Sequence, residues 1–178
     1  TCAILDNQDI TCWGANSQGQ LGTGNTSLIG DSPDEIGDGL PIIAASHSSA
    51  TAAPTNLALG WDHTCVLFDD GTVTCWGSNA HGQLGIGSTT TIGDQPAEMG
   101  DSLVQVALPS GRTATQITAG DGFTCALLDN SEVACWGKND KGQMGIGTTS
   151  NQGDSAGEMG DSLTTVDLSY NALYVDAG

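Results

Sequence analysis

The sequence predicts an all-β protein made of three tandem copies of one four-stranded unit. One pattern of cysteines, tryptophan and glycines recurs three times, starting at Thr1, Thr64 and Thr124. Short segments of alternating, β-prone residues are separated by turns rich in Gly, Asp and Asn. The chain has 26 glycines but only 13% charged residues, against about 25% in typical soluble domains. Because no segment has the periodicity of an amphipathic helix, tight turns and half-buried strands are the expected structure.

The repeat covers nearly the whole chain. The three copies open with TCAILDNQDITCWG, TCVLFDDGTVTCWG and TCALLDNSEVACWG, and a loop containing GQLG or GQMG follows each of them. The central Leu or Met of this loop is expected to fill the core of the unit. We assign residues 1–63, 64–123 and 124–178 to the three repeats, with a Ser/Thr/Ala/Pro-rich insertion at residues 44–55.

Each repeat contains a hairpin whose two strands carry the two cysteines. The predicted strands are residues 64–68 and 72–76 in the second copy, 56–60 and 116–120 before the hairpins, and 103–108 and 163–168 after them. The turn is Asp-Asp-Gly at residues 69–71, and Asn stands at its centre in the other two copies. Four short strands joined by glycine turns are typical of a propeller blade or a stacked β unit.

The six cysteines fall into three pairs at the same place in each repeat. Zinc sites usually bring two thiolates within a few residues of each other and add histidines. Here the cysteines of a pair stand farther apart, and His47, His63 and His81 occupy three different repeat positions. We therefore predict disulfides, which persist in oxidising compartments, and a secreted or cell-surface protein. The predicted pairs are Cys2 with Cys12, Cys65 with Cys75, and Cys125 with Cys135.

The charge of the chain is strongly acidic. Twenty-one Asp and Glu face only three Lys and Arg, giving a net charge of −18. Nucleic-acid binding and attraction to anionic membranes both need clustered basic residues, so neither partner is expected. The sequence also lacks an apolar run long enough for membrane insertion. A cation, a basic partner or a simply solvated surface fits this charge.

The segment CALLDN followed by VACWG, then by GQMG, resembles the repeat of the regulator of chromosome condensation family. The resemblance implies a seven-bladed β-propeller with one four-stranded sheet per blade. Three units would then form part of a larger propeller, or an open, assembled β array. The paired cysteines and the inserted GD-x-x-x-E segments are similar to the secreted or surface-borne branches. The founder's nucleotide-exchange activity is not carried over, because no segment here corresponds to the features on which it depends.

Three acidic positions recur in the inserted segments. Ca²⁺ needs several oxygen ligands, and three carboxylates in a short span supply some of them. Acidic residues in turns also cap backbone N–H groups, and both interpretations stay open. No cofactor other than Ca²⁺ is suggested. The residues are Asp31, Glu35 and Asp38, then Asp94, Glu98 and Asp101, then Asp154, Glu158 and Asp161.

We expect no catalytic function. Residues 153–157 read GDSAG and match the nucleophile-elbow string, but that motif needs a strand-to-helix turn, and the second copy has no serine there. Trp61 is a more interesting residue because its counterpart in the third copy is Asp121, so the repeat does not require it. We take it as a candidate ligand contact, whereas the tryptophans after the second cysteines are expected to pack inside the blades.

Two features predict glycosylation. Asn25 begins the only N-glycosylation sequon, and the insertion resembles a short mucin-like segment. The candidate O-glycan sites there are Ser46, Ser48, Ser49, Thr51 and Thr55.

Two functions are predicted for this non-enzymatic chain. The first is a structural subunit of an extracellular fibre or surface array, because an open run of blades leaves sheet edges uncovered. Gly178 also occupies the repeat position of Gly60 and Gly120, so one copy can continue into another. In this case the partner is a second copy or further repeats. The alternative is a propeller-type recognition module that binds a protein or a glycan.

Overall fold

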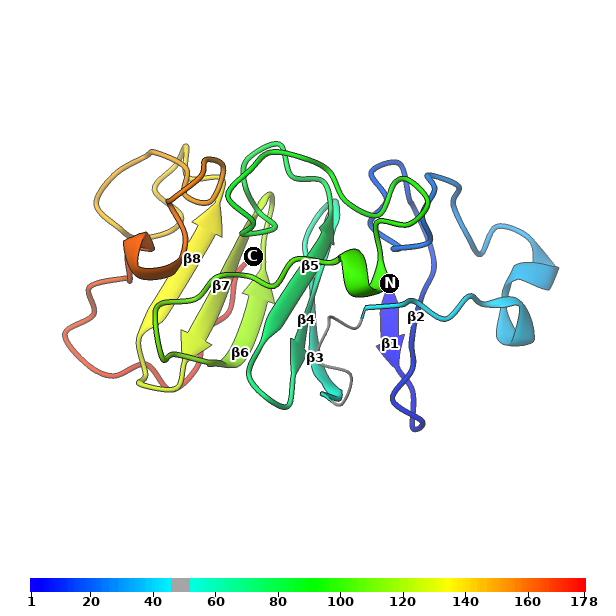
Figure 1. Ribbon diagram of the computed structural model, residues 1–178, viewed down its shortest axis with the longest axis horizontal. Coiled ribbons are helices and arrows are strands. Elements are labelled where there is room, and N and C mark those ends of the chain that lie inside the picture. Colours follow the sequence, from blue (N-terminus) through cyan, green and yellow to red (C-terminus); the bar gives the residue numbers. More distant parts are fainter. Residues whose placement is uncertain (46–51) are drawn as a thin grey trace.

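Three antiparallel sheets stand side by side along the long axis of the molecule, as the computed structural model shows (Figure 1). The structure describes residues 1–45 and 52–178. Among them the only helices are short 3-10 turns, η1 (Pro33–Glu35), η2 (Gly37–Gly39), η3 (Gly100–Ser102) and η4 (Gly160–Ser162). The all-β prediction is therefore confirmed. The strands are β1 (Cys2–Ile4), β2 (Ile10–Cys12), β3 (Pro54–Leu59), β4 (His63–Phe68), β5 (Val73–Gly77), β6 (Ala114–Ala119), β7 (Phe123–Leu128) and β8 (Val133–Gly137).

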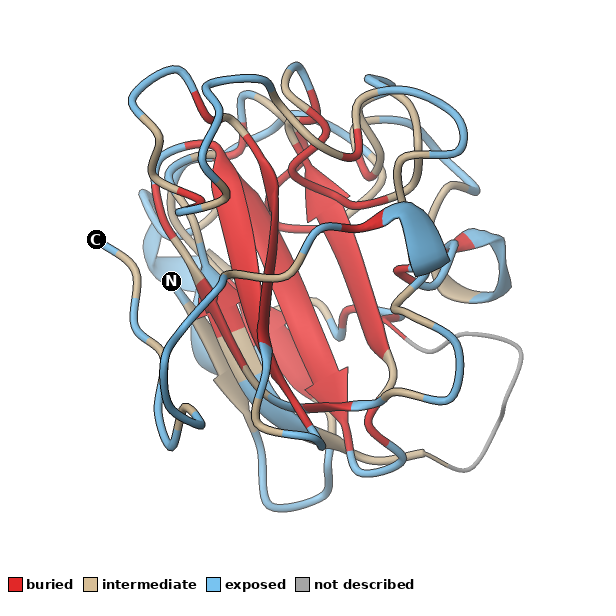
Figure 2. Cartoon of the chain, turned by 90° about the vertical axis from the view of Figure 1, so that its left-hand side faces the viewer, coloured by how far each residue is buried: buried red, intermediate tan, exposed pale blue. Residues whose placement is uncertain are grey.

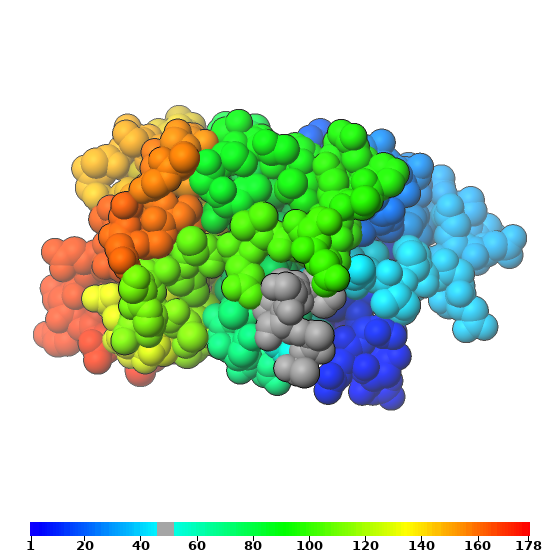
Figure 3. Space-filling model, in the orientation of Figure 1, coloured from blue at the N-terminus to red at the C-terminus, as the bar shows by residue number. Residues whose placement is uncertain are grey.

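The second and third sheets each begin one strand before their sequence repeats. Sheet order is β1-β2, β3-β4-β5 and β6-β7-β8, and we call these sheets blade 1, blade 2 and blade 3. Strand β3 thus lies at the end of the first sequence repeat but pairs with β4 of the second blade. In the space-filling view the blades form successive bands along the molecule (Figure 3).

The cysteines of each pair face each other across the hairpin. Cys65 pairs with Cys75 in the register of β4 and β5, and the other two hairpins have the same register. The paired Cα atoms lie 4.1 Å apart, close to the value for a non-hydrogen-bonded pair. The structure joins each pair by a disulfide.

The hairpin turns place a positive φ at their third residue. Gly71 has a φ of 78°, and Gln8 and Ser131 adopt 71° and 67° at the same position. The central Asn of the first and third copies does not adopt this conformation. Instead, Asn7 and Asn130 accept a bond from the backbone two residues later, and the strained conformation falls on the next residue.

The fourth strands predicted at residues 103–108 and 163–168 each shrink to a single bridge, and blade 1 has an equivalent bridge. Gln105 bridges Thr74, Thr165 bridges Ala134, and Ile42 bridges Thr11. The stretch is short because a 3-10 turn, η3, ends just before it in blade 2 and Pro109, which lacks an N–H, follows it. The chain after the 3-10 turn therefore pairs with the outer strand of each blade at one residue only.

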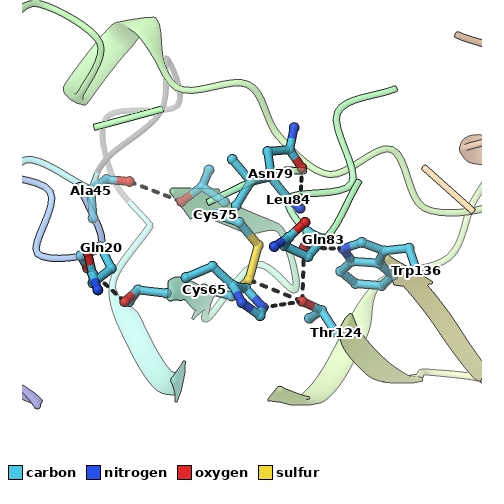
Figure 4. Close-up of a disulfide and its surroundings, with 12 residues drawn as sticks. Gln20, Ala45, Cys65, Cys75, Asn79, Gln83, Leu84, Thr124 and Trp136 are labelled. Carbon is cyan, nitrogen blue, oxygen red and sulfur yellow. Dashed lines mark hydrogen bonds between the residues drawn. A yellow bond between two sulfur atoms is a disulfide. The ribbon is translucent and has the colours of Figure 1, made fainter. Parts of the chain in front are cut away.

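The hydrophobic core lies between the blades, where the strands are buried (Figure 2). At each joint one backbone oxygen accepts two bonds from the next blade. The carbonyl of Gln83 accepts from the Thr124 hydroxyl (2.9 Å) and from the Trp136 indole (3.0 Å), as Figure 4 shows. Gly85 leaves room for this indole, since a Cβ there would lie 2.8 Å from its nitrogen. We call this arrangement the blade joint.

The joint between blades 1 and 2 is built in the same way. Thr64 and Trp76 both donate to the carbonyl of Gln20, at 2.9 and 3.1 Å. The loop residue after each Gln is buried, at 2% for Leu21, 0% for Leu84 and 1% for Met144. The predicted core role of the GQLG and GQMG loops is confirmed.

Candidate recognition site

Trp61 is an exposed aromatic residue beside the joint between blades 1 and 2. It lies in the short loop between β3 and β4 and is 80% exposed. Its neighbour Asp62 accepts a bond of 3.2 Å from the side chain of Gln20, which ties the loop to blade 1. A cavity of about 130 Å³ adjoins the indole. This exposure makes the ring of Trp61 accessible to a ligand.

The equivalent loop of blade 3, between β6 and β7, carries an aspartate in place of the tryptophan. Asp121, at the position of Trp61, pairs with Lys138 at 2.9 Å. The hydrogen-bonded carboxylate of Asp121 raises the pKa of Lys138, so this amine stays charged at neutral pH. The two loops lie side by side, since the carbonyl of Gly120 is 2.9 Å from the place where a Cβ of Gly60 would stand. The site therefore combines the exposed indole, the carboxylate of Asp62 and the Asp121–Lys138 ion pair.

Buried asparagines shape the long loops at the same end of the blades. Asn79 is completely buried, accepts from the N–H of Leu84 at 3.0 Å and donates to the carbonyls of Ser88 and Thr90. Asn16 and Asn139 make the equivalent bonds in the other blades. We assigned these residues no role from the sequence, although the repeated WG-x-N string was visible in all three copies.

Replacing Asn79 with Ala is expected to destabilise the protein by about 3 kcal/mol, because the buried N–H of Leu84 and two partly buried carbonyls lose the side chain that holds the loop. Urea denaturation followed by circular dichroism measures the change. The matched control is Asn130→Ala in an exposed turn, where a loss below about 1 kcal/mol is expected. Equal losses in both variants would contradict the role given to Asn79.

The recurring glutamates cap backbone N–H groups. Glu98 accepts from Gly93 and Gln95 through one oxygen, at 2.8 and 3.0 Å. Glu35 and Glu158 do the same in their own loops, and the N–H of Gly30 holds the pKa of Glu35 below its usual range. The described residues contain no group of three His, Cys, Asp or Glu placed to hold a metal ion. The geometry favours the capping interpretation for these glutamates.

The aspartates of the same segments have different surroundings. Asp161 accepts from the backbone and hydroxyl of Ser110 at 2.6 and 2.8 Å, and these bonds hold its pKa below the usual range. It thereby links η4 to the loop that leads into β6. Asp154 accepts from Ser155 and Asn151 in its own loop. Asp31 interacts with Glu35 of its own repeat, but no three of these carboxylates are grouped to hold a cation within the described residues.

The serine of the nucleophile-elbow string lies in a capped loop. The backbone N–H of Ser155 donates to Glu158 and its hydroxyl to Asp154, and no strand-to-helix turn is present around it. This environment does not match a nucleophile elbow.

The glycosylation candidates divide between described and undescribed residues. Asn25 is exposed, and its side-chain oxygen accepts from Ser27. Thr55 lies in β3, with its hydroxyl bonded to the carbonyl of Leu67, rather than in a flexible insertion. Ser46, Ser48, Ser49 and Thr51 fall outside the described residues.

Comparison with known families identifies the repeat. The profiles of the "Regulator of chromosome condensation (RCC1) repeat" match residues 55–83, 114–143 and 70–127, which together span half of the chain. The chain belongs to the RCC1 repeat family. The resemblance inferred from the cysteine and glycine pattern is thus confirmed.

Curated relatives share the repeat at moderate identity. The ultraviolet-B receptor UVR8 of Arabidopsis thaliana is 38% identical over 49% of this chain and 18% of its own length. The protein RCC2 of Mus musculus is 31% identical over 75% of this chain and 22% of its own length. This RCC1-repeat chain therefore spans less than a quarter of these relatives.

Solved structures support the propeller architecture. Human WBSCR16 superimposes with a TM-score of 0.70 at 20% identity, covering 99% of this chain and 39% of that one. Yeast RCC1 (Prp20), solved with Kap60, gives 0.60 at 23% identity, covering 96% and 36%. The three open sheets are thus consecutive blades of a partial β-propeller.

Of the two functions predicted from sequence, the comparisons favour the recognition module. RCC1 repeats typically serve as protein-binding modules, and nothing in the comparisons supports a fibre. The part of the chain matched to relatives carries only repeats. No helix in the described part of the chain is long and apolar enough to cross a bilayer.

Proposed function

We propose that this RCC1-repeat chain is part of a propeller that recognises a basic segment of a partner protein through the Trp61 face. The observation that carries the proposal is the 80% exposure of Trp61 at a position that the repeat fills with aspartate elsewhere. An exposed indole contacts a Lys or Arg side chain through its face, and the neighbouring Asp62 favours the same charge. The net charge of −18 steers a basic partner toward the protein.

Solved relatives are consistent with a protein partner. Prp20p of Saccharomyces cerevisiae binds Gsp1p and histones, and yeast RCC1 has been solved in a complex with Kap60. These partners belong to those proteins. They support the class of ligand proposed here, a protein, over a glycan.

The proposal is tested by affinity capture of partner proteins on the immobilised chain and on two immobilised variants. The immobilised chain is compared with Trp61→Asp, which installs the residue that blade 3 carries and so preserves the fold. Tyr170→Ala is the control, because Tyr170 is 89% exposed and lies beside the β7–β8 turn at the other end of the blade. Wild type and control should retain a basic protein that Trp61→Asp loses and that salt releases. Retention by all three baits, or binding of a glycan array through Trp61 without a protein partner, would overturn the proposal.

The three hairpin cysteine pairs also support an oxidising, extracellular location, which we propose for this chain. Mass spectrometry of non-reduced peptides from the native source should link Cys65 to Cys75 and show the same pattern in the other hairpins. Free thiols on all six cysteines would rule out this location.

A further inference from the structure

A groove of about 380 Å³ crosses the joint between blades 1 and 2. This volume is within the range of about 300–1,000 Å³ that is usual for ligand sites. The groove shares no lining residue with the cavity beside Trp61. We call it the joint groove. Its lining consists of residues 22–24 and 41–44 from blade 1 and residues 96, 97 and 99 from the inserted GD-x-x-x-E segment of blade 2.

One departure from the repeat lies in the lining of the joint groove. Thr23 stands where blades 2 and 3 carry Ile86 and Ile146. Ile86 packs against the hydrophobic core between blades 2 and 3. Thr23 is smaller, and its hydroxyl accepts a bond of 3.2 Å from the side chain of Asn16. The joint groove therefore lies at a position where the next blade places an isoleucine side chain.

A second departure adds exposed apolar surface to the joint groove. Ile42 is 55% exposed, whereas the residues that form the same bridge in blades 2 and 3 are Gln105 and Thr165. Gln105 is also exposed, although blade 1 precedes it in the structure. The position is therefore an exposed one within the blade, and blade 1 fills it with an isoleucine.

The wall from blade 2 keeps a methyl group in an unfavourable backbone conformation. Ala97 is exposed and has a φ of 69°, in the left-handed region that residues with a Cβ rarely adopt. Blade 3 has a glycine at the same position, Gly157, with a φ of 86°. Such departures from favoured geometry tend to gather at binding sites. The side chain of Ala97 extends the apolar lining that begins at Pro96.

The surroundings of the joint groove are acidic. All Lys and Arg of the chain lie at Arg112 or beyond it, so blade 1 and the inserted segment of blade 2 contain none. That segment contains Asp94 and Glu98, which flank the lining residues Pro96 and Ala97 in sequence. A second copy of this chain, with a net charge of −18, would be repelled. The charge therefore favours a basic partner for the groove.

We propose that the joint groove binds an aliphatic side chain of a partner protein, in an extended segment that also carries Lys or Arg. The aliphatic side chain lies beside Thr23 and Ile42, and the basic residues next to it are attracted by Asp94 and Glu98. This second docking surface goes beyond the function proposed for the Trp61 face and does not depend on it.

Peptide selection on the purified chain tests this proposal. A phage-displayed library of random dodecapeptides is selected on the immobilised wild type in the presence of excess soluble Thr23→Ile chain, which removes peptides that bind elsewhere. Thr23→Ile installs the residue of the other two blades and fills the groove. The fold should persist, because Asn16 keeps two carbonyl partners, as Asn79 has in blade 2. The selected peptides should carry an aliphatic residue close to a Lys or Arg.

Isothermal titration of the selected peptides then compares the variants. Thr23→Ile and Ile42→Gln should each bind at least about tenfold more weakly than the wild type, because the buried surface of an aliphatic side chain is lost. The matched control is Val104→Thr, which replaces a 58% exposed aliphatic residue outside the groove with the residue at position 164 of blade 3. This control and Trp61→Asp should bind as the wild type does, which separates the joint groove from the Trp61 face. Equal affinity for all variants, peptides without an aliphatic or a basic residue, or no enrichment of peptides would overturn the proposal.

Discussion

Trp136→Ala is expected to lower the free energy of unfolding by about 3–5 kcal/mol, the usual cost of truncating a fully buried aromatic residue. Trp136 has no exposed surface, and its indole is one of two donors to the carbonyl of Gln83. The substitution removes both the packing and the hydrogen bond at the joint between blades 2 and 3. Urea denaturation monitored by far-ultraviolet circular dichroism gives the change.

Trp61→Ala provides the control for this prediction. The same side chain is removed, but from a position that is 80% exposed, so the free energy of unfolding should change by less than about 0.5 kcal/mol. Comparable losses of unfolding free energy in the two variants would mean that the buried contacts of Trp136 at the blade joint do not stabilise the protein.

His63→Phe is expected to make the protein less sensitive to acid. His63 is 1% exposed at the start of β4; its Nε2 contacts the Thr124 hydroxyl at 2.9 Å, while its Nδ1 has no partner. Burial lowers the pKa of His63 to about 4, against the opposing effect of the Asp121 carboxylate. A proton on Nδ1 would therefore stand buried without an acceptor.

The sign of this pH effect follows from linkage. The unfolded chain binds a proton at His63 below pH about 6.5, while the folded protein resists it down to about pH 4, so stability falls as the pH drops through this window. The loss amounts to about 3 kcal/mol for a shift of this size. Phenylalanine is compatible with the site, because Phe123 occupies the same position in blade 3 and packs on Gly120 as His63 packs on Gly60.

Urea denaturation of wild type and His63→Phe at pH 7.5 and pH 4.5 measures the difference. The two proteins should differ little at pH 7.5, and the wild type should lose more stability on acidification. Parallel losses would show that the pH dependence arises from the acidic surface rather than from His63.

The hairpins could be predicted because several independent features of the sequence indicate the same strand pairing. Alternating β-prone residues, a turn signal and two cysteines at matching positions point to one register, and three copies repeat it. The role of Leu84 could be predicted in the same way, because an apolar residue recurs at this position of the glycine-rich loop in all three copies. The fourth strand was harder, because its length depends on how the chain leaves the blade and not on β propensity.

The polar residues show where sequence reasoning stops. Asn79 and Glu98 are both loop residues with several hydrogen-bonding possibilities, and the sequence does not say which backbone groups lie near them. A carboxylate in a turn serves a cation or an N–H equally well until the loop is folded. Trp61 could be singled out only because one repeat departs from another at that position.

The exchange rates of the four tryptophan indole N–H protons test whether each blade docks its tryptophan on the carbonyl of the preceding blade. The measurement is nuclear magnetic resonance in deuterated buffer. We expect slow exchange at Trp76 and Trp136, which donate to Gln20 and Gln83, and fast exchange at Trp13 and Trp61. Fast exchange at all four indoles, or protection of Trp61 in place of Trp136, would contradict this docking.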